Sequence, residues 1–457
     1  MKKELIAALM VCGVCRAEVP KPNIVLIVVD DLGWADVQAL PEAKCPYRTP
    51  NIQKLAQQGM VFSDAYAACP VCSPTRAALM TGKSPAALRL TAHIPGNVAY
   101  SKTRIPVDAK KQPAETGEFL PLEEVTFAEL LKSDGYDTAF FGKWHLAGIN
   151  ANVNRETCGA VAPQYHPDCQ GFDLSIGGCA YGMPRSYFSP YQNATLPDGP
   201  AGEYLTDRLT DEAIAFVKQK HEHPFLLSLN YYSVHIPLQP RPDLVDESYG
   251  ERADYAAMIA CVDENIGRLM NVLEGSDTLV ILTSDNGGLF GNGPLHGDKG
   301  ELWEGGIRIP QLAVWQNIIS PGTICREPVS SVDILPTLLA AAQSSQKLPS
   351  DVEGVSLLPL LKQEPGFERK DPLFWHYPHF HHDGGPMGSA IRDGNLKLIF
   401  SYETGEAQLF DLENDLSETQ DLSARFPERA ELLKKKLFQW LEHVNAAMPT
   451  EAERNEP

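Results

Sequence analysis

The sequence has few basic residues for its length. It contains 39 lysines and arginines against 59 aspartates and glutamates in 457 residues, so its formal net charge is −20. A nucleic-acid-binding protein needs a basic face to neutralise phosphates, and this balance therefore argues against nucleic acid as a partner. It leaves room for a small anionic substrate, because a pocket can be locally basic on an acidic protein.

Long apolar runs, internal repeats and low-complexity tracts are also missing. No apolar run reaches the roughly 20 residues that a membrane-spanning helix needs, so we expect no transmembrane segment. The apolar fraction of 43% and the charged fraction of 21% are those of an ordinary globular protein, which excludes disorder for most of the chain. The length suits about three domains, or one large α/β domain with an appendage.

Cysteine is sparse as well. Ten cysteines, of which eight lie beyond the N-terminal leader described next, are too few for a disulfide scaffold in a chain of this length. Cys158, Cys169 and Cys179 lie close enough in sequence to hold one loop disulfide. Their spacing lacks the paired Cys-x-x-Cys form of structural zinc sites.

The N-terminus has the pattern of a targeting signal. Lys2 and Lys3 precede a short apolar run over residues 5–14, and a small-residue cleavage site follows at 15–17. We therefore predict a signal peptide over residues 1–17 and a periplasmic or secreted protein. Two alternatives stay open, a buried first helix and a lipoprotein anchor at Cys12 or Cys15.

Four apolar runs predict buried strands of a mostly parallel sheet. They cover residues 24–29, 138–141, 225–229 and 278–282. Amphipathic stretches over residues 49–58, 125–133, 206–220 and 254–274 predict helices between them. Strands that alternate with helices predict a doubly wound α/β domain, which we place at residues 18–345.

Unusual polar side chains follow each of these four strands. Ligands of open α/β sheets bind at the carboxyl ends of strands, so we expect these side chains to share one edge of the sheet. For any single pair, the alternative is a helix cap or a turn. In chain order the side chains are Asp30, Asp31, Lys143, His145, His235, Asp285 and Asn286.

A second, smaller domain is predicted over residues 346–457, after a polar linker at 344–349. Asp393-Gly394 is a hairpin signal within residues 390–399, and residues 408–412 form another short strand candidate. We expect an α+β domain with an antiparallel sheet, and a polar tail that frays from Met448. Residues 427–444 predict a terminal amphipathic helix with the apolar face Leu432, Leu433, Leu437, Trp440 and Leu441.

Residues 72–82 read Cys-Ser-Pro-Thr-Arg-Ala-Ala-Leu-Met-Thr-Gly. A cap at Cys72 or Ser73, Pro74 in the first turn and the stop at Gly82 predict a short helix. Its N-terminus favours anions, which makes Cys72 a candidate low-pKa nucleophile. The alternative is an inert cysteine before a short helix.

This segment resembles the maturation signature of the sulfatase family, Cys-x-Pro-x-Arg followed by Thr-Gly. Further segments similar to that family occur in order over nearly the whole chain: 22–31, 49–51, 142–146, 235–237, 283–287, 299–310, 333–337 and 409–412. The resemblance extends to arylsulfatase A-like and bacterial carbohydrate sulfatases. It implies an alkaline-phosphatase-like fold, in which helices sandwich a large mixed, mostly parallel sheet and a smaller C-terminal domain follows.

Asp30, Asp31, Asp285 and Asn286 offer hard oxygen ligands, which suit Ca²⁺ better than a soft metal. The resemblance implies one Ca²⁺ ion, with Mg²⁺ as the less favoured alternative. It also implies that a separate maturation enzyme oxidises Cys72 to formylglycine, which then serves as a further ligand of the metal.

The resemblance further implies covalent catalysis, in which the hydrated formylglycine attacks sulfur and a formylglycine–sulfate intermediate forms. Arg76 would hold the formylglycine. His235, supported by Lys299, would protonate the leaving alcohol, and His145 would act as the base that expels inorganic sulfate. Lys143 and Lys299 would neutralise the sulfate oxygens together with the metal.

Substrate contacts are expected from five residues: Lys143, His235, Lys299, His296 and His379. For Arg308 we favour a conformational over a catalytic role. A segment rich in aromatic residues and histidine suggests either a second metal site or a loop over the mouth of the site. We favour the loop, because the histidines lack regular ligand spacing: His376, His379, His381 and His382.

We expect a sulfate monoester as substrate, carried by a small molecule or the end of an extracellular saccharide. Two alternatives stay open. One is a formylglycine-dependent phosphonate or phosphodiester hydrolase of the same superfamily, and the other is a catalytically dead protein that binds sulfated sugars. A two-zinc phosphatase is less favoured, because it would need further Asp and His ligands and normally Ser or Thr at position 72.

Overall fold

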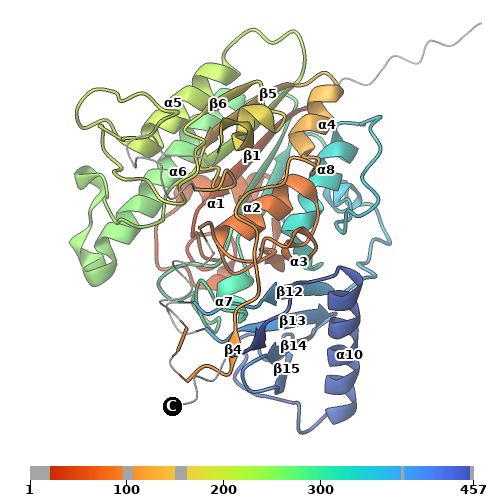
Figure 1. Ribbon diagram of the computed structural model, residues 1–457. Helices are drawn as coiled ribbons and strands as arrows, with labels where there is room; N and C mark the ends of the chain where they lie inside the picture. The colour runs from red at the N-terminus through yellow and green to blue at the C-terminus, as the bar shows by residue number, and fades with distance from the viewer. Residues whose placement is uncertain (1–20, 96–104, 107, 150–161, 382–384, 453–457) are drawn as a thin grey trace, which may run out of the picture.

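The computed structural model describes residues 21–95, 105–106, 108–149, 162–381 and 385–452. Its main feature is an eight-stranded sheet in the order β10-β2-β9-β8-β1-β7-β5-β6 (Figure 1). The central strands β8, β1, β7, β5 and β6 run parallel, whereas β9 is antiparallel to both of its neighbours. The strands are β1 (Asn23–Val29), β2 (Met60–Phe62), β5 (Asp137–Gly142), β6 (Leu174–Ile176), β7 (Phe225–Tyr231), β8 (Thr278–Ser284), β9 (Gln311–Trp315) and β10 (Thr323–Cys325).

Strand β1 shows why the sheet is covered on both sides. Val25, Ile27 and Val29 belong to one hydrophobic cluster, and the alternate residues of the strand belong to another, with none of them exposed to solvent. This follows from the period of two along a strand, which sends successive side chains to opposite faces. The four predicted strands are confirmed and extend by at most two residues at either end.

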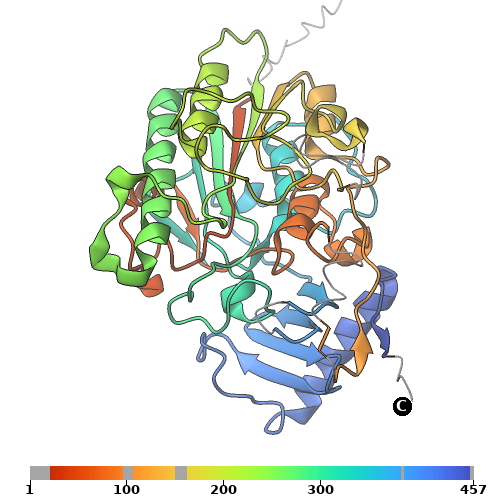
Figure 2. The ribbon, with the colours of Figure 1, turned by 60° about the vertical axis from the view of Figure 1, so that its left-hand side comes forward.

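Helices cover each face of the sheet, as Figure 2 shows. The cluster on one face contains α1 (Pro50–Gln58), α5 (Leu205–Val217) and α6 (Ala253–Leu273). The cluster on the other contains α2 (Cys72–Thr81), α4 (Phe127–Ser133), α8 (Ile334–Ala341) and the short α3 (Pro85–Leu88) and α9 (Leu358–Leu361). The predicted mixed sheet sandwiched by helices is therefore confirmed.

A second sheet lies beside the first and is antiparallel throughout, in the order β12-β13-β14-β15. Its strands are β12 (Leu373–Tyr377), β13 (Gly388–Asp393), β14 (Leu396–Ser401) and β15 (Ala407–Asp411). Asp393-Gly394 turns the β13–β14 hairpin as predicted, with Gly394 at φ 60°, a conformation that favours glycine.

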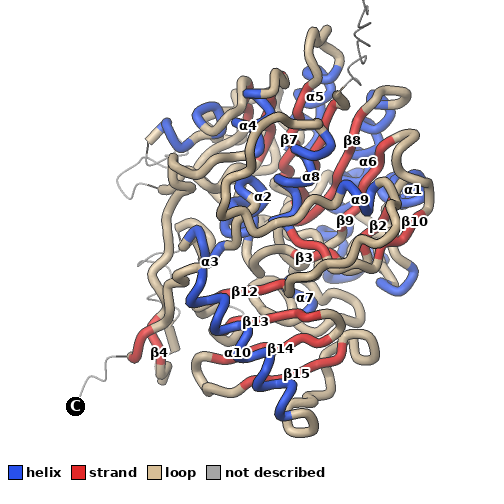
Figure 3. Tube along the Cα trace, turned by 90° about the vertical axis from the view of Figure 1, so that its right-hand side faces the viewer, coloured by secondary structure: helices blue, strands red, loops and turns tan. Residues whose placement is uncertain are grey.

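Helix α10 (Pro427–His443) packs across one face of this small sheet (Figure 3). Leu433, Leu437 and Leu441 are buried, but Leu432 is 55% exposed, so its assignment to the apolar face was wrong. The buried stripe recurs every four residues, and Leu432 lies about 100° off it, since successive helical residues are rotated by that angle.

The other face of the small sheet packs against the large part of the protein. Trp375, Ala390, Ile399 and Phe410 share a hydrophobic cluster with residues that surround the start of α2 and the segment after β8. Trp375 Nε1 also donates to the Ala67 carbonyl at 2.8 Å. The small sheet thus supports the loops that end near the carboxyl edge of the large sheet.

The C-terminal tail is more ordered than predicted. The strand β16 (Thr450–Glu451) pairs antiparallel with β4 (Lys111–Gln112). Ala452 N–H donates to the Lys110 carbonyl at 3.0 Å. The expectation of a frayed tail is therefore wrong for residues 450–452, because backbone pairing with a distant segment compensates for their polar composition. The last five residues lie outside the described part of the chain.

Several predictions concern residues that the structure does not describe, namely the signal peptide over 1–17, Cys12 and Cys15, and Cys158. Of the proposed loop disulfide, Cys169 is described as free and exposed, and Cys179 is described as buried. The domain boundary at 345/346 stays a prediction: Leu357 and Leu361 still pack in a cluster of the large sheet, and the small sheet begins at Leu373. None of the described helices is long and apolar enough to cross a membrane.

Candidate active site

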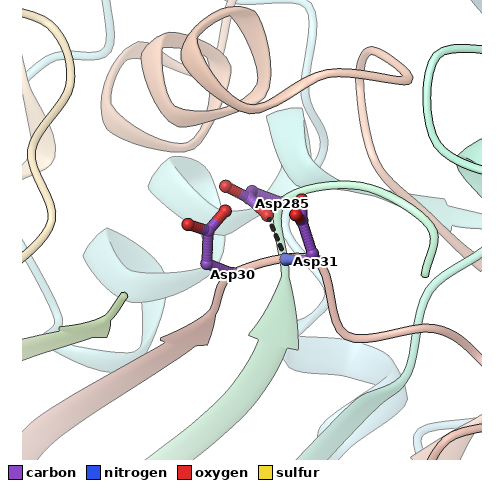
Figure 4. Close-up of side chains that lie close together, drawn as sticks. All are labelled: Asp30, Asp31 and Asp285. Atoms are coloured by element: carbon purple, nitrogen blue, oxygen red, sulfur yellow. Dashed lines mark hydrogen bonds between the residues drawn. The ribbon is translucent and has the colours of Figure 1, made fainter. Parts of the chain in front are cut away.

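Three carboxylates meet at the carboxyl ends of β1 and β8 (Figure 4). The two strands are adjacent and parallel, and the register pairs Val29 with Ser284, so Asp30 and Asp31 emerge beside Asp285. Their ligand oxygens lie within 4.8 Å of one another, and none of the three residues is exposed. Asp31 N–H donates to Asp285 Oδ1 at 3.2 Å.

Each carboxylate is paired with a buried cation. Arg76 Nη2 lies 2.8 Å from Asp285 Oδ2, and its Nε donates to the same oxygen at 2.9 Å. Lys143 Nζ lies 2.5 Å from Asp30 Oδ2 and Lys299 Nζ lies 2.5 Å from Asp31 Oδ1. Three charges of each sign make the cluster neutral, which is how buried charges are tolerated.

The pKa values of the acids follow from this arrangement. Burial and the neighbouring Asp285 raise the pKa of Asp30 well above its ordinary value, although Lys143 opposes the rise. Burial is also the largest single effect on Asp31 and Asp285, but the neighbouring cations together outweigh it, Lys299 foremost for Asp31 and Arg76 foremost for Asp285, so both pKa values are lowered.

The donor set fits a hard metal ion. Asp30 Oδ1, Asp31 Oδ2 and Asn286 Oδ1 are buried and have no hydrogen-bond partner. The Asn286 amide nitrogen already donates to Asp31 Oδ1 and to the Gly287 carbonyl, so its oxygen is left for another group. Carboxylate and amide oxygens are the ligands that Ca²⁺ takes. Among the described residues, this is the one cluster of three Asp, Glu, His or Cys side chains whose ligand atoms lie close enough together to hold a metal ion.

Helix α2 presents Cys72 and Arg76 to this cluster from the same face, one turn apart. The helix begins at Cys72 itself, with Val71 as N-cap and no side-chain cap, so capping by Cys72 or Ser73 was wrong. Ser73 Oγ instead accepts from the Ile94 N–H at 3.0 Å. Gly82 ends the helix at φ 69°, as predicted.

The thiol of Cys72 faces His145, with Sγ 3.3 Å from Nδ1. The other ring nitrogen, Nε2, bonds to the Ile94 carbonyl oxygen. A carbonyl can only accept, so Nε2 carries the proton and Nδ1 of the neutral ring is an acceptor. His145 is therefore oriented to take a proton from whatever group residue 72 carries.

The prediction that Cys72 is a low-pKa thiol is wrong for this environment. Burial raises its pKa above the ordinary value, and the carboxylates of Asp285 and Asp30 act in the same direction. The lysines Lys143 and Lys299 oppose these effects without overcoming them. Desolvation and acidic neighbours, which the local sequence does not show, thus decide the direction.

The environment disfavours the charged form of both site histidines. Burial and Lys143 hold the pKa of His145 well below its usual range. Burial and Lys299 lower the pKa of His235 to about 3, although Asp31 opposes this. His235 Nδ1 lies 2.8 Å from the Ile236 carbonyl oxygen, and Nε2 lies 3.8 Å from Asp31 Oδ2.

Two of these residues hold a backbone conformation that is costly for any residue except glycine. Asp31 has φ 58° and His145 has φ 59°, in the left-handed region where a side chain costs on the order of 1–3 kcal/mol. Asp31 is held there by its N–H bond to Asp285 and by the Tyr255 hydroxyl, which donates to its carbonyl at 3.2 Å. Such strain is typical of functional positions.

The two histidines predicted to contact substrate from outside the cluster, His296 and His379, lie in different surroundings. His296 is exposed and stacks on Trp303, with ring centroids 4.2 Å apart. His379 does not lie at an open mouth: it is buried, and Nε2 lies 2.8 Å from Thr91 Oγ1. That His379 contacts substrate stays a prediction. Burial lowers the pKa of His379 to about 3.

His381, from the same segment, lies against the loop of Lys299 instead. A Cβ at Gly300 would lie 2.2 Å from the His381 ring. His376 bonds to Ser389 Oγ at 2.7 Å and to the Ala447 carbonyl at 2.9 Å, so it is structural. His382 lies outside the described residues.

Arg308 has the conformational role that we favoured. It is buried, its Nε donates to the Ser63 carbonyl at 3.0 Å, and its guanidinium pairs with Glu304 at 2.9 Å and Asp64 at 3.1 Å.

Two supporting residues were missed. Asn230 is the last residue but one of β7, and its Oδ1 lies 3.4 Å from Arg76 Nη1; a polar residue near the end of a largely apolar strand was the available signal. Gly182 leaves room for the His145 ring, because a Cβ there would lie 2.2 Å from Cε1. Nothing in the local sequence around Gly182 pointed to this contact.

Comparisons with known proteins point to one family. A family model described as Sulfatase matches residues 22–344, and one described as N-sulphoglucosamine sulphohydrolase, C-terminal, matches residues 295–447. A protein of Formosa agariphila named Sulfatase is 31% identical over 93% of this chain and 90% of its own length. The human N-acetylgalactosamine-6-sulfatase is 30% identical over 78% of this chain and 68% of its own length.

A solved structure is also similar over nearly the whole chain. The structure of Ps i-CgsB in complex with k-i-k-neocarrahexaose has a TM-score of 0.72 and 29% identity, covering 92% of this chain and 93% of that one. Both the large and the small sheet therefore fall within the shared fold.

Proposed function

Because the chain belongs to the sulfatase family, with its alkaline-phosphatase-like fold, and is a sulfuric ester hydrolase, we propose that it removes sulfate from an extracellular saccharide after Cys72 has been converted to formylglycine. The observation that carries the proposal is the placement of Cys72. It lies at the start of α2, 3.3 Å from the acceptor nitrogen of His145, beside the buried carboxylate cluster.

The carboxylate cluster would hold one Ca²⁺ ion through Asp30, Asp31, Asp285 and Asn286, with residue 72 as a further ligand. The ion would supply positive charge where the sulfate oxygens gain negative charge. The three unpartnered buried oxygens support this assignment. Formylglycine at position 72 would supply a hydroxyl nucleophile and, through its second hydroxyl, an exit that a thiol lacks.

The surrounding residues act by orientation and proton transfer. Arg76 orients residue 72 and neutralises Asp285, while Lys143 and Lys299 neutralise the sulfate. His145 Nδ1 accepts a proton from residue 72. A bound sulfate brings negative charge against His235, which raises its pKa and favours the protonated ring that donates to the leaving alcohol, with support from Lys299.

A saccharide substrate is supported by the relatives. One is named for N-acetylgalactosamine-6-sulfate and a solved neighbour holds k-i-k-neocarrahexaose. The N-terminal leader pattern supports export to the periplasm or the outside. The net charge of −20 opposes long-range attraction of a polysulfated polymer, so we propose that the site takes the sulfated end of a saccharide through local contacts.

The maturation step is tested by mass spectrometry of the peptide that contains Cys72, from protein made in its native host or with a maturation enzyme. We expect a formylglycine residue. An unmodified thiol in an active enzyme would contradict the mechanism, and an unmodified thiol in an inactive one would favour a binding protein.

Turnover is tested with a set of defined sulfated monosaccharides and disaccharides, beside a phosphonate monoester and a phosphodiester. We expect release of inorganic sulfate from at least one sugar and none from Cys72→Ala. Wild-type-like activity of Cys72→Ala, or faster turnover of the phosphorus esters than of every sulfate ester, would overturn the proposal.

A further inference from the structure

Lys299 reaches the buried carboxylate cluster from a loop that connects β8 to the short helix α7 (Glu304–Ile307). The segment is held by backbone bonds. Lys299 N–H donates to the Gly288 carbonyl at 3.1 Å and Gly300 N–H donates to the Pro70 carbonyl at 2.9 Å. The position of the Lys299 ammonium therefore depends on how this segment is fixed at its other end.

That other end is the turn at Glu304-Gly305-Gly306. A Cβ at Gly305 would lie 1.8 Å from the Gly297 carbonyl oxygen, and one at Gly287 would lie 1.9 Å from the Gly305 carbonyl oxygen. Gly287 N–H also donates to the Gly306 carbonyl at 2.9 Å. With backbones in such close contact, a displacement of the turn moves both residue 287, next to Asn286, and the segment that carries Lys299.

Two residues from the C-terminal part of the chain hold the turn in place. Lys397 on β14 lies 2.9 Å from Glu304 Oε1 and 2.8 Å from Glu418 Oε1. Glu418, in the loop after β15, accepts from the Glu304 backbone N–H at 2.6 Å. Glu304 is thus held by side chain and backbone at once. Figures 1 and 3 both show α7 next to the small sheet.

These contacts form part of a larger buried network. Lys397 and Glu304 have no exposed surface and Glu418 is 3% exposed. The Tyr66 hydroxyl donates to Glu304 Oε2 at 2.7 Å, and three basic side chains face three acidic ones. The charged members are Asp64, Glu304, Arg308, Arg392, Lys397 and Glu418.

A buried ionic network is a poor way to gain stability, since apolar residues of similar volume often replace it at no cost. It does fix geometry, because each charge must keep its partner within a short distance. In this fold the network fixes the turn at Glu304, which positions the segment that carries Lys299. The residues that hold this turn, Lys397 and Glu418, come from the C-terminal part of the chain.

We propose that Lys397 and Glu418 are positioning residues for Lys299. They hold Glu304, and through it the segment that presents the Lys299 ammonium to the substrate. The C-terminal sheet thereby takes part in the reaction without touching the reacting atoms. This inference rests on the proposed function only for the role of Lys299, because the contacts of Lys397 and Glu418 with Glu304 do not depend on the substrate.

The test compares Lys397→Met with Lys436→Met in the full chain, made with a maturation enzyme. Lys436 pairs with Asp393 at 2.5 Å, with side chains 42% and 34% exposed, so it is a matched loss of a lysine ion pair outside the network. Two properties are measured: kcat and KM on a sulfated sugar and on 4-nitrophenyl sulfate, and amide hydrogen exchange by mass spectrometry.

For Lys397→Met we expect kcat on the sugar to fall on the order of 10²-fold, as a roughly 1 Å misplacement does, with KM changed much less. The fall should be smaller on 4-nitrophenyl sulfate, whose phenolate leaves with little proton donation. Hydrogen exchange should rise in peptides over residues 296–308. Lys436→Met should match wild type in the kinetics on both esters and in hydrogen exchange.

Should Lys397→Met fail to fold, the double variant Lys397→Met with Glu418→Gln removes one charge of each sign and takes its place. An unchanged kcat, equal loss on both esters, or exchange that rises uniformly over the chain would overturn the proposal. If wild type releases no sulfate from any ester, the proposed function fails, and the exchange of residues 296–308 alone then decides whether Lys397 grips the segment.

Discussion

Calcium removal should measurably destabilise this protein, whether or not Cys72 has been modified. Asp30, Asp31 and Asp285 lie within 4.8 Å of one another with no exposed surface, and three oxygens of the site lack partners. The folded state therefore offers ligands that the unfolded chain cannot hold together. An ion that binds only the folded state stabilises it by RT ln(1 + [L]/Kd).

The size of the effect can be worked from chain length. At 100 times Kd the ion contributes about 2.7 kcal/mol, and at 1,000 times Kd about 4.1 kcal/mol. A chain of 457 residues has an unfolding entropy of about 1 kcal/mol per kelvin near its midpoint. Saturating Ca²⁺ should therefore raise the Tm by about 3–4 °C above that of chelator-treated protein.

The assay is thermal unfolding across a Ca²⁺ series that starts from chelator-treated protein, repeated with Mg²⁺. Asp285→Asn should abolish the dependence on Ca²⁺. Asp277→Asn, at the exposed residue just before β8, should leave it intact. A Tm that stays constant from chelator to millimolar Ca²⁺ would refute the reasoning, and an equal or larger response to Mg²⁺ would refute the preference for calcium.

Three further outcomes are expected. Arg76→Met leaves Asp285 buried without its cation, so it should lower the free energy of unfolding by about 3–5 kcal/mol in chelator-treated protein; an unchanged denaturation midpoint would contradict the pairing. Burial lowers the pKa of His376 to about 4, so between pH 6.5 and 4 the unfolded chain binds a proton that the folded protein does not. The free energy of unfolding should therefore decrease as the pH is lowered from 6.5 to 4, by up to about 1.4 kcal/mol per pH unit. In thermal melts His376→Gln, but not the exposed His443→Gln, should flatten this slope. Leu437→Ala empties a fully buried position under the small sheet and should cost about 2–5 kcal/mol while the kcat of the folded protein stays unchanged; a matching loss of kcat would show that α10 affects the site.

Much of the architecture could be predicted from local pattern. Strand β1 illustrates why: an uninterrupted apolar run predicts a strand buried on both faces, and Asp30-Asp31 directly after it marks the edge where ligands bind. The same reasoning at β8 brought Asp285 and Asn286 to that edge. These predictions needed only the pattern of apolar residues along the chain and the rule that the carboxyl ends of parallel strands lie at the same edge of a sheet.

Other features depended on contacts that no local pattern encodes. The tautomer of His145 is set by the Ile94 carbonyl, and the raised pKa of Cys72 is set by burial among acids. His379 and His381 differ by two positions, yet the structure buries one against Thr91 and lays the other on Gly300.

The amino-acid sequence by itself thus predicted the α/β class and the acidic side chains that meet at the sheet edge beside Cys72, because each follows from residue type and short-range spacing. Only the tertiary structure decided which cation pairs with which carboxylate and which residues fix the Lys299 segment. Lys397 and Glu304 are 93 positions apart, and the distance between such residues is set by the packing of one sheet against another, which residue spacing alone does not specify.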